Sequence, residues 1–408
     1  MAAKSTALCL LCRGTKKLCG KAYCPVLVVN NARTLLRPIE GELLEGSTPP
    51  SVFVSWVGYP KVKIGPAAPP IVGDTRVYDL PEKWLGISVD QVLEMRLSLV
   101  RGMSRIDVRR PSTLDGLREI ALSSAPVDVE MKFAKPPKAP PILDSHLSPM
   151  GPGGSLERVR VLGNPRIPRP VEKAYGDTDL PAIKAVAYLY ASGIPVSSIQ
   201  KIFSVGALGV GSRRKLVPTR WSITAVDDTI SNHILKTVKQ FKSFNKVLYF
   251  ERKYAKNTFT AIIAPGSWSY EWIEAWFPRT TWNKGPTVEV EGDYEGYKGR
   301  TTYAVLGGCY YAARLATAEY MLREKRQGTA VLIREIYEGF DVPIGVWFVR
   351  ENLRALFKTK PERYDTVEEA LARLDMATRL PLETWLRTSR LLRRLLSQKS
   401  LEAYLKWQ

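Results

Sequence analysis

Four of the chain's five cysteines lie in one short segment near its beginning, CLLCRGTKKLCGKAYCP. Their spacing, C-x2-C-x6-C-x4-C, lets two pairs of thiolates approach one ion from different sides, as in tetrahedral structural sites of Zn(II). Basic residues and no acidic ones occupy residues 1–25, and such cations stabilise a four-thiolate site. A disulfide pair or free thiols are the alternatives. The predicted zinc ligands are Cys9, Cys12, Cys19 and Cys24.

The fifth cysteine, Cys309, lies alone in LGGCYYAARL, where we expect a small buried residue rather than a nucleophile. A second candidate site is the basic segment GVGSRRKLVPTR, in which cations behind glycines are suited to contact phosphates. The predicted nucleic-acid-binding residues are Arg213, Arg214, Lys215 and Arg220.

Asp227, Asp228 and His233 follow this basic segment. Paired carboxylates could hold Mg(II) for phosphodiester cleavage, so a nucleic-acid-processing enzyme is an alternative function. Neighbouring residues on a helix point in different directions, however, which favours Asp227 or Asp228 as a helix cap. The sequence therefore assigns no catalytic residue.

The end of the chain, QKSLEAYL, fits the pattern of a peptide that binds a sliding clamp. In that pattern the glutamine amide hydrogen-bonds the clamp, and one helical turn brings the apolar side chains onto one plug. A C-terminal helix packed on its own domain is the alternative. The residues that would contact the clamp are Gln398, Leu401, Tyr404 and Leu405, of which Leu405 departs from the usual aromatic residue.

The charge balance favours a polyanionic partner, because 60 Lys and Arg residues face 40 Asp and Glu residues, a formal net charge of +20 over 408 residues. DNA is the leading candidate, and RNA remains open. No signal sequence or uninterrupted apolar span is recognised. We therefore expect no membrane association and a cytoplasmic protein associated with the nucleoid.

Apolar alternation predicts a strand pair that turns at Gly58, and the segment after Ser88 predicts a helix capped by that serine. Residues 177–209 predict two helices around SGIP, either a helical hairpin or a helix-turn-helix that presents Ser197, Ser198, Gln200 and Lys201. Three tryptophans spaced by four residues predict a helix with a buried aromatic face, with base stacking as the alternative. They are Trp268, Trp272 and Trp276.

The overall pattern predicts an α+β protein with two globular parts joined by a Pro/Gly-rich connection, in which His146 should be solvated. The predicted parts are the zinc-binding motif at 1–25, an N-terminal α+β domain at 26–133, the connection at 134–155, a C-terminal α+β domain at 156–360, a helical region at 361–397 and the clamp motif at 398–405.

The chain resembles the archaeal Nre family of DNA repair proteins along almost its whole length. The matching segments include the cysteine motif, FVSWVGYPKVKIGPAAPP, YDLPEKWLGISVDQVLEMRLSLVRG, GNPRIPRP, RWSITAVDD, GGCYYAARLATAEYMLREKRQG, PIGVWFVREN and QKSLEAYL. The resemblance implies a role in DNA damage repair, zinc binding by the N-terminal cysteines and docking on the sliding clamp PCNA through the C-terminal motif. It implies no particular reaction.

Overall fold

The chain divides into two compact units in the computed structural model, which describes residues 9, 11–13, 16, 18, 41–109 and 115–397. The N-terminal unit comprises Tyr23–Ile230 and Pro343–Phe348. The C-terminal unit comprises Met1–Ala22, Ser231–Val342 and Val349–Gln408. Sheets and helices occur in both units, which confirms the predicted α+β class. The predicted connection at 134–155 lies inside the N-terminal unit.

The N-terminal unit is built on a mixed sheet with the strand order β1-β5-β6-β4-β3-β2. Its elements are β1 (Leu43–Thr48), β2 (Val52–Val54), β3 (Lys61–Ala68), η1 (Arg76–Asp79), η2 (Pro81–Lys83), α3 (Val89–Leu97), β4 (Val100–Asp107), α4 (Asp115–Leu122), β5 (Val127–Phe133), β6 (Gly153–Val161), α5 (Arg169–Gly176), α6 (Ala182–Ala191), α7 (Val196–Ser204), η3 (Gly211–Arg213) and the start of α8 (Thr219–Val238). Neighbouring strands are antiparallel except β4 and β6, which are parallel.

Two local predictions in this unit are confirmed. Strands β2 and β3 form an antiparallel pair whose connection turns at Gly58, with a φ of +84° that favours glycine. Ser88 caps α3 in a capping box: its hydroxyl accepts a hydrogen bond from the Gln91 amide nitrogen at 3.2 Å, and the Gln91 side chain accepts one from the Ser88 nitrogen. Sequence signals confined to a few residues therefore predict these elements well.

The Pro/Gly-rich segment at 134–155 is an ordered, extended part of the N-terminal unit. Backbone hydrogen bonds pair Ile142 with Met150 in both directions, and Ala139 with Gly153. Leu143, Leu147 and Met150 are buried, and the last two belong to an apolar cluster with Phe53 and Leu99. The free energy gained by burying these apolar side chains holds the segment in place although it forms no helix or strand before β6.

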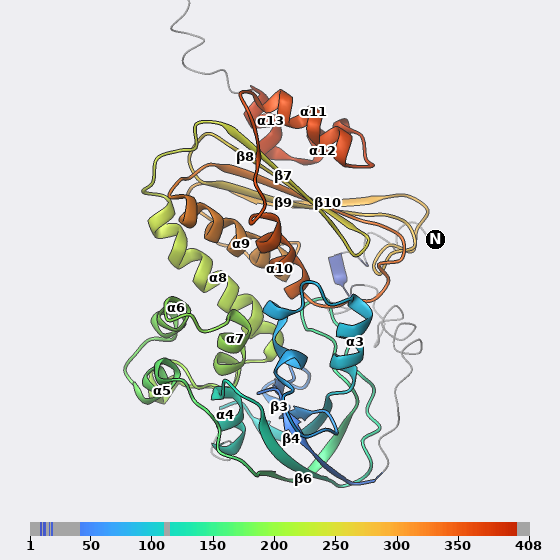
Figure 1. Cartoon of the computed structure of the whole chain (residues 1–408), viewed down its shortest axis with the longest axis vertical. Helices are drawn as coiled ribbons and strands as arrows, with labels where there is room; N and C mark the ends of the chain where they lie inside the picture. Colours follow the sequence, from blue (N-terminus) through green and yellow to red (C-terminus); the bar gives the residue numbers. More distant parts are fainter. Residues whose placement is uncertain are drawn as a thin grey trace, which may run out of the picture. The chain divides into compact units, whose positions relative to one another are not determined.

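The C-terminal unit contains a second mixed sheet, with the strand order β10-β9-β11-β8-β7-β12. Its elements are the rest of α8, β7 (Val247–Tyr254), β8 (Asn257–Ala264), β9 (Ser269–Trp276), β10 (Glu289–Glu295), α9 (Gly308–Glu324), β11 (Thr329–Ile336), α10 (Trp347–Leu356), β12 (Glu362–Tyr364), α11 (Val367–Ala377), α12 (Leu382–Thr388) and α13 (Arg390–Ser397). Helices α11 to α13 cover one face of the sheet and α9 lies on the other (Figure 1).

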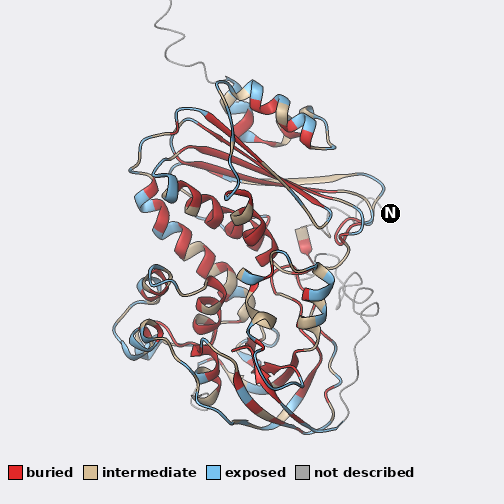
Figure 2. Ribbon diagram, viewed as in Figure 1, coloured by how far each residue is buried: buried red, intermediate tan, exposed pale blue. Residues whose placement is uncertain are grey.

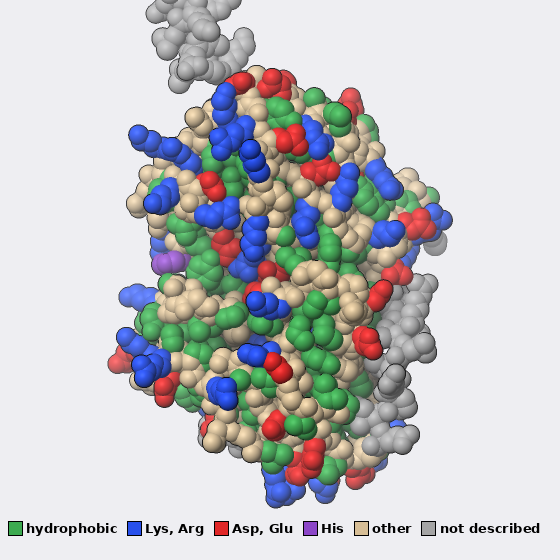
Figure 3. Space-filling view, viewed as in Figure 1, with side chains coloured by type: hydrophobic (Ala, Val, Ile, Leu, Met, Phe, Trp, Pro, Cys, Tyr) green, Lys and Arg blue, Asp and Glu red, His purple; other side chains and the backbone are tan. Residues whose placement is uncertain are grey.

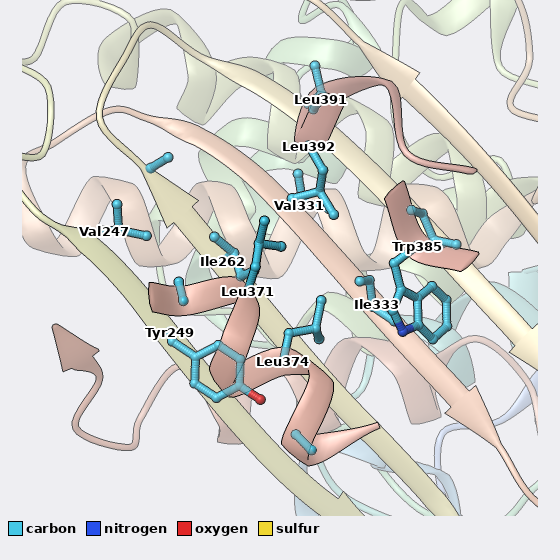
Figure 4. Close-up of a cluster of buried hydrophobic side chains, with 14 of the residues drawn as sticks. Val247, Tyr249, Ile262, Val331, Ile333, Leu371, Leu374, Trp385, Leu391 and Leu392 are labelled. Carbon is cyan, nitrogen blue, oxygen red and sulfur yellow. The ribbon is translucent and has the colours of Figure 1, made fainter. Parts of the chain in front are cut away.

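Both faces of the middle of this sheet are buried, so the central strands β8, β9 and β11 are coloured as buried in Figure 2. On one face, Leu371 and Leu374 of α11, Trp385 of α12 and Leu391 and Leu392 of α13 pack on strand residues such as Ile262 and Ile333 (Figure 4). Such a cluster supplies the hydrophobic stabilisation of the sheet and of the C-terminal helices together.

The tryptophan segment forms a strand and not the predicted helix, but the predicted burial of its three aromatic side chains is confirmed. Trp272 and Trp276 lie on β9, with Trp268 just before the strand, and all three are buried. A spacing of four residues fits a helix with 3.6 residues per turn, but it is also a multiple of the two-residue period of a strand. The three side chains therefore point to one side of a strand in the sheet core, which excludes them from stacking on bases.

Within the residues that the structure describes, no helix is long and apolar enough to cross a membrane.

Candidate nucleic-acid interface

The predicted phosphate-binding residues lie between η3 and the first turn of α8. Arg213 and Lys215 are exposed, whereas Arg214 is partly buried. The Arg214 guanidinium donates hydrogen bonds to the carbonyl oxygens of Gly209, Tyr175 and Asp177 at 2.7–2.8 Å. Arg214 therefore holds this segment against the end of α5, and it leaves Arg213 and Lys215 facing solvent.

Arg220 makes ionic and hydrogen-bonded contacts inside the N-terminal unit. Its guanidinium donates to Asp144 Oδ2 at 3.0 Å and to His146 Nδ1 at 2.8 Å. A guanidinium can only donate, so Nδ1 accepts and the ring proton of His146 lies on Nε2. His146 is buried and not solvated as expected. Its Nδ1 accepts a hydrogen bond from Arg220 and its backbone nitrogen donates one to Asp144, so both polar atoms are paired in the interior.

Three chain segments meet beside Lys215. The Val108 nitrogen donates to the Pro60 carbonyl at 2.9 Å, and the Leu216 nitrogen donates to the Val108 carbonyl at 3.4 Å. The turn before β3, the end of β4 and the basic segment are therefore adjacent. Each carries an exposed cation next to its hydrogen-bonded residue, and these cations are Lys61, Arg109 and Lys215.

Two aromatic side chains lie at the same place. Tyr59 in the β2–β3 turn and Trp221 in the first turn of α8 have ring centroids 5.2 Å apart. Close to half of each side chain is exposed, 49% for Tyr59 and 45% for Trp221. The Val54 nitrogen donates to the Thr219 hydroxyl at 2.9 Å, which ties β2 to the start of α8 and brings the two rings together. No local pattern in the sequence marks either residue.

The acidic residues of α8 do not form a metal site in the described part of the chain, where no group of three or more His, Cys, Asp and Glu could hold an ion. Asp227 is fully buried and accepts a hydrogen bond from the Gln200 amide at 2.9 Å, while His233 is exposed. The capping prediction is also wrong, because α8 begins at Thr219 and both aspartates lie inside the helix.

The two helices around SGIP form as predicted, but the polar residues of the second are directed into the N-terminal unit. Ser197 donates to the Glu82 carboxylate at 2.7 Å, and the Lys201 ammonium lies 3.4 Å from Asp79 Oδ2. Ser197, Gln200 and Lys201 are buried. This arrangement matches the helical hairpin and leaves these three residues unable to read a DNA groove.

Of the four predicted zinc ligands, the structure describes Cys9 and Cys12, and Cys19 and Cys24 lie outside the described residues. The Arg13 nitrogen donates to the Cys9 carbonyl at 2.8 Å in a helical turn. Residues three apart in such a turn share one side of it, so Cys9 and Cys12 fit one half of a tetrahedral site.

Arg13 joins this turn to the sheet of the C-terminal unit. Its guanidinium donates to Glu274 Oε2 at 2.5 Å, and Arg334 donates to Oε1 of the same carboxylate at 3.1 Å. Burial by itself raises the pKa of Glu274, but the attraction of the two guanidinium groups outweighs it, so the pKa lies below its usual value.

Cys309 lies beside this buried ion cluster, with its Sγ atom 3.4 Å from Arg13 Nη1. Burial, and next the charge of Glu274, raise the pKa of the Cys309 thiol to about 11. A thiol with so high a pKa is protonated at neutral pH, and only the thiolate is a strong nucleophile. Cys309 is therefore a buried structural residue, as predicted.

The four predicted clamp-binding residues, Gln398, Leu401, Tyr404 and Leu405, lie outside the described residues, directly after α13. Glu271 of β9 accepts hydrogen bonds from the backbone nitrogens of Arg390 and Leu391 at 2.8 and 2.9 Å, and from the Ser389 hydroxyl. A carboxylate at this end satisfies helix N–H groups and complements the helix dipole. Glu271 thus fixes α13 on the sheet.

Comparison with known proteins identifies the family. Residues 18–283 match the family described as "Archaeal Nre, N-terminal", and residues 295–404 match "Archaeal Nre, C-terminal". The chain belongs to the archaeal Nre family. The two matches are separated by residues 284–294, which include most of β10 and lie within the C-terminal unit of this Nre protein.

Curated relatives cover nearly all of this Nre chain. DNA repair protein NreB of Archaeoglobus fulgidus is 50% identical over 95% of the chain and 97% of its own length. DNA repair protein NreA of the same organism is 37% identical over 89% of the chain and 92% of its own length. NreA of Haloferax volcanii is 34% identical over 84% of each. No solved structure matches the chain significantly.

Proposed function

We propose that this Nre protein acts in DNA repair, binds DNA through exposed cations of the N-terminal unit and docks on PCNA through residues 398–405. The observation that carries the proposal is the family match along nearly the whole chain, together with relatives named as DNA repair proteins. The charge of the chain supports DNA as a partner. RNA is the competing polyanion.

Binding to DNA by surface cations has a measurable signature. Lys and Arg side chains are spread over the face drawn in Figure 3, with fewer Asp and Glu side chains among them. The adjacent cations Lys61, Arg109 and Lys215 concentrate positive charge on three neighbouring segments. Fluorescence anisotropy with labelled DNA should show affinity that falls steeply as salt rises, because cations that contact phosphates release condensed counterions. A matched RNA strand used as competitor decides between the two nucleic acids.

Docking on PCNA is proposed from the C-terminal pattern and its position. Helix α13, which Glu271 fixes on the sheet, ends at Ser397, so the clamp motif begins directly after an anchored helix. Calorimetry with PCNA from the same organism should detect binding that is lost when Gln398, Leu401 and Tyr404 are changed to Ala. Glu402→Ala is the matched control, since the pattern gives that position no contact. Equal binding by both variants would refute this part of the proposal.

Zinc binding by the four N-terminal cysteines is the third part of the proposal. Four thiolates would fill a tetrahedral site and leave no open position, so the ion would stabilise structure rather than catalyse a reaction. Metal analysis of the purified chain should find zinc that is lost in Cys9→Ala and Cys12→Ala variants and retained in Cys309→Ser. Zinc retained in the first two variants would contradict the assignment.

A further inference from the structure

The N-terminal unit carries an exposed pair of aromatic side chains, which phosphate binding by cations does not explain. Tyr59 and Trp221 come from distant parts of the sequence, and their ring planes meet at 51°. Exposed Val57 lies in the same turn as Tyr59. Large aromatic side chains normally bury most of their area in a core, so two half-exposed rings in contact mark a surface that can bind a flat apolar group.

The surroundings of the pair are basic. Arg213 and Lys215 precede α8, and Lys61 follows the turn that carries Tyr59. Asp107 is a nearby carboxylate: it lies opposite Lys61 across β3 and β4, and it accepts a hydrogen bond from the Arg109 nitrogen at 3.0 Å. The start of the long helix α8 adds the positive end of its dipole. Cations around aromatic faces are the combination that binds single-stranded nucleic acid, since phosphates meet the cations and bases stack on the rings.

We propose that Tyr59 and Trp221 form a stacking platform for unpaired bases of single-stranded DNA, with Lys61, Arg109 and Lys215 contacting the flanking phosphates. The inference rests on the proposed DNA binding and goes beyond it by naming the form of DNA. Paired bases inside a duplex do not expose their faces, so the platform distinguishes single strands, gaps and frayed ends from intact duplex. A stacked base also requires no particular sequence, because every base has an aromatic face.

Anisotropy with three labelled probes tests the proposal in the full chain: a 20-nucleotide thymidine strand, a duplex of the same length and a strand of the same length whose residues lack bases. The wild type should bind the thymidine strand at least about tenfold more tightly than the strand without bases, as stacking of one or more bases would give. Trp221→Ala and Tyr59→Ala should each weaken thymidine-strand binding about tenfold and change duplex binding less than about twofold. Trp221→Phe, which keeps a ring, should retain most of the affinity.

Tyr303→Ala is the matched control, because Tyr303 is an exposed tyrosine of the C-terminal unit. Thermal unfolding of each variant shows whether it is folded, and if Trp221→Ala unfolds, Trp221→Phe and the strand without bases still decide the question. Equal binding of the strands with and without bases would overturn the stacking platform while leaving DNA binding intact. Absence of binding to all three probes would instead overturn the proposed DNA binding itself.

Discussion

The buried ion cluster around Glu274 makes a quantitative prediction about stability. Glu274 is completely buried and balances two guanidinium groups, Arg13 and Arg334, whose side chains are 7% and 4% exposed. Glu274→Gln keeps the shape of the side chain but leaves both cations beside a neutral amide. Removing one partner of a buried ion pair costs about 3 to 5 kcal/mol of unfolding free energy. For a unit of this size that lowers the melting temperature by roughly 10 °C.

Scanning calorimetry at neutral pH measures the change, and two further variants test its cause. Glu338→Gln removes an ion pair of the same unit at 2.6 Å, but its partners are 57% and 77% exposed, so the change should stay below about 1 kcal/mol. Arg13→Met leaves Glu274 paired with Arg334 and no net buried charge. The loss of unfolding free energy in Arg13→Met should therefore be larger than in Glu338→Gln and smaller than in Glu274→Gln. This order is expected although Arg13→Met removes more polar atoms than Glu274→Gln. A Glu274→Gln protein as stable as Glu338→Gln would refute the electrostatic account.

Three further predictions concern buried groups of the C-terminal unit. Because the folded-state pKa of Glu274 lies below its usual value, its stabilising charge is fully present above about pH 4.5 and is lost as pH falls further, so the stability difference between wild type and Glu274→Gln should shrink in acid melts. Glu271→Ala should release α13, detected as faster tryptic cleavage at Arg390, Arg393 and Arg394 than in the wild type; an unchanged rate would show that α13 does not depend on Glu271. Cys309, with its pKa raised to about 11, should react with a thiol reagent at pH 7.5 only after unfolding, and rapid labelling of the native chain that mass spectrometry locates at Cys309 would contradict its burial.

The sequence predicts correctly those elements whose signal lies within a few neighbouring residues. The Ser88 cap and the turn at Gly58 each depend on residues within one turn of the chain. Periodicity fails where two periods coincide, as for Trp268, Trp272 and Trp276. The capping signal fails at α8, because the helix already begins at Thr219, eight residues before Asp227.

The candidate interface could be predicted in part. The basic segment is visible in the sequence, but charge alone cannot show that Arg214 and Arg220 hydrogen-bond inside the unit while Arg213 and Lys215 face solvent. Lys61, Arg109, Tyr59 and Trp221 come together through long-range strand and helix contacts. No local pattern records such contacts, so this part of the site becomes visible only in the folded chain.

The most direct test of the account is the salt dependence of DNA binding in a variant with Lys61, Arg109 and Lys215 changed to Ala. Anisotropy with a 20-nucleotide thymidine strand should show a slope of log affinity against log salt about 2 units shallower than in the wild type, since each phosphate contact to a single strand contributes about 0.7. A control with Lys298, Lys358 and Lys360 changed to Ala loses the same charge from exposed positions of the C-terminal unit and should keep the wild-type slope. Equal slopes in the two variants, or a wild type that binds no DNA, would contradict the proposed interface.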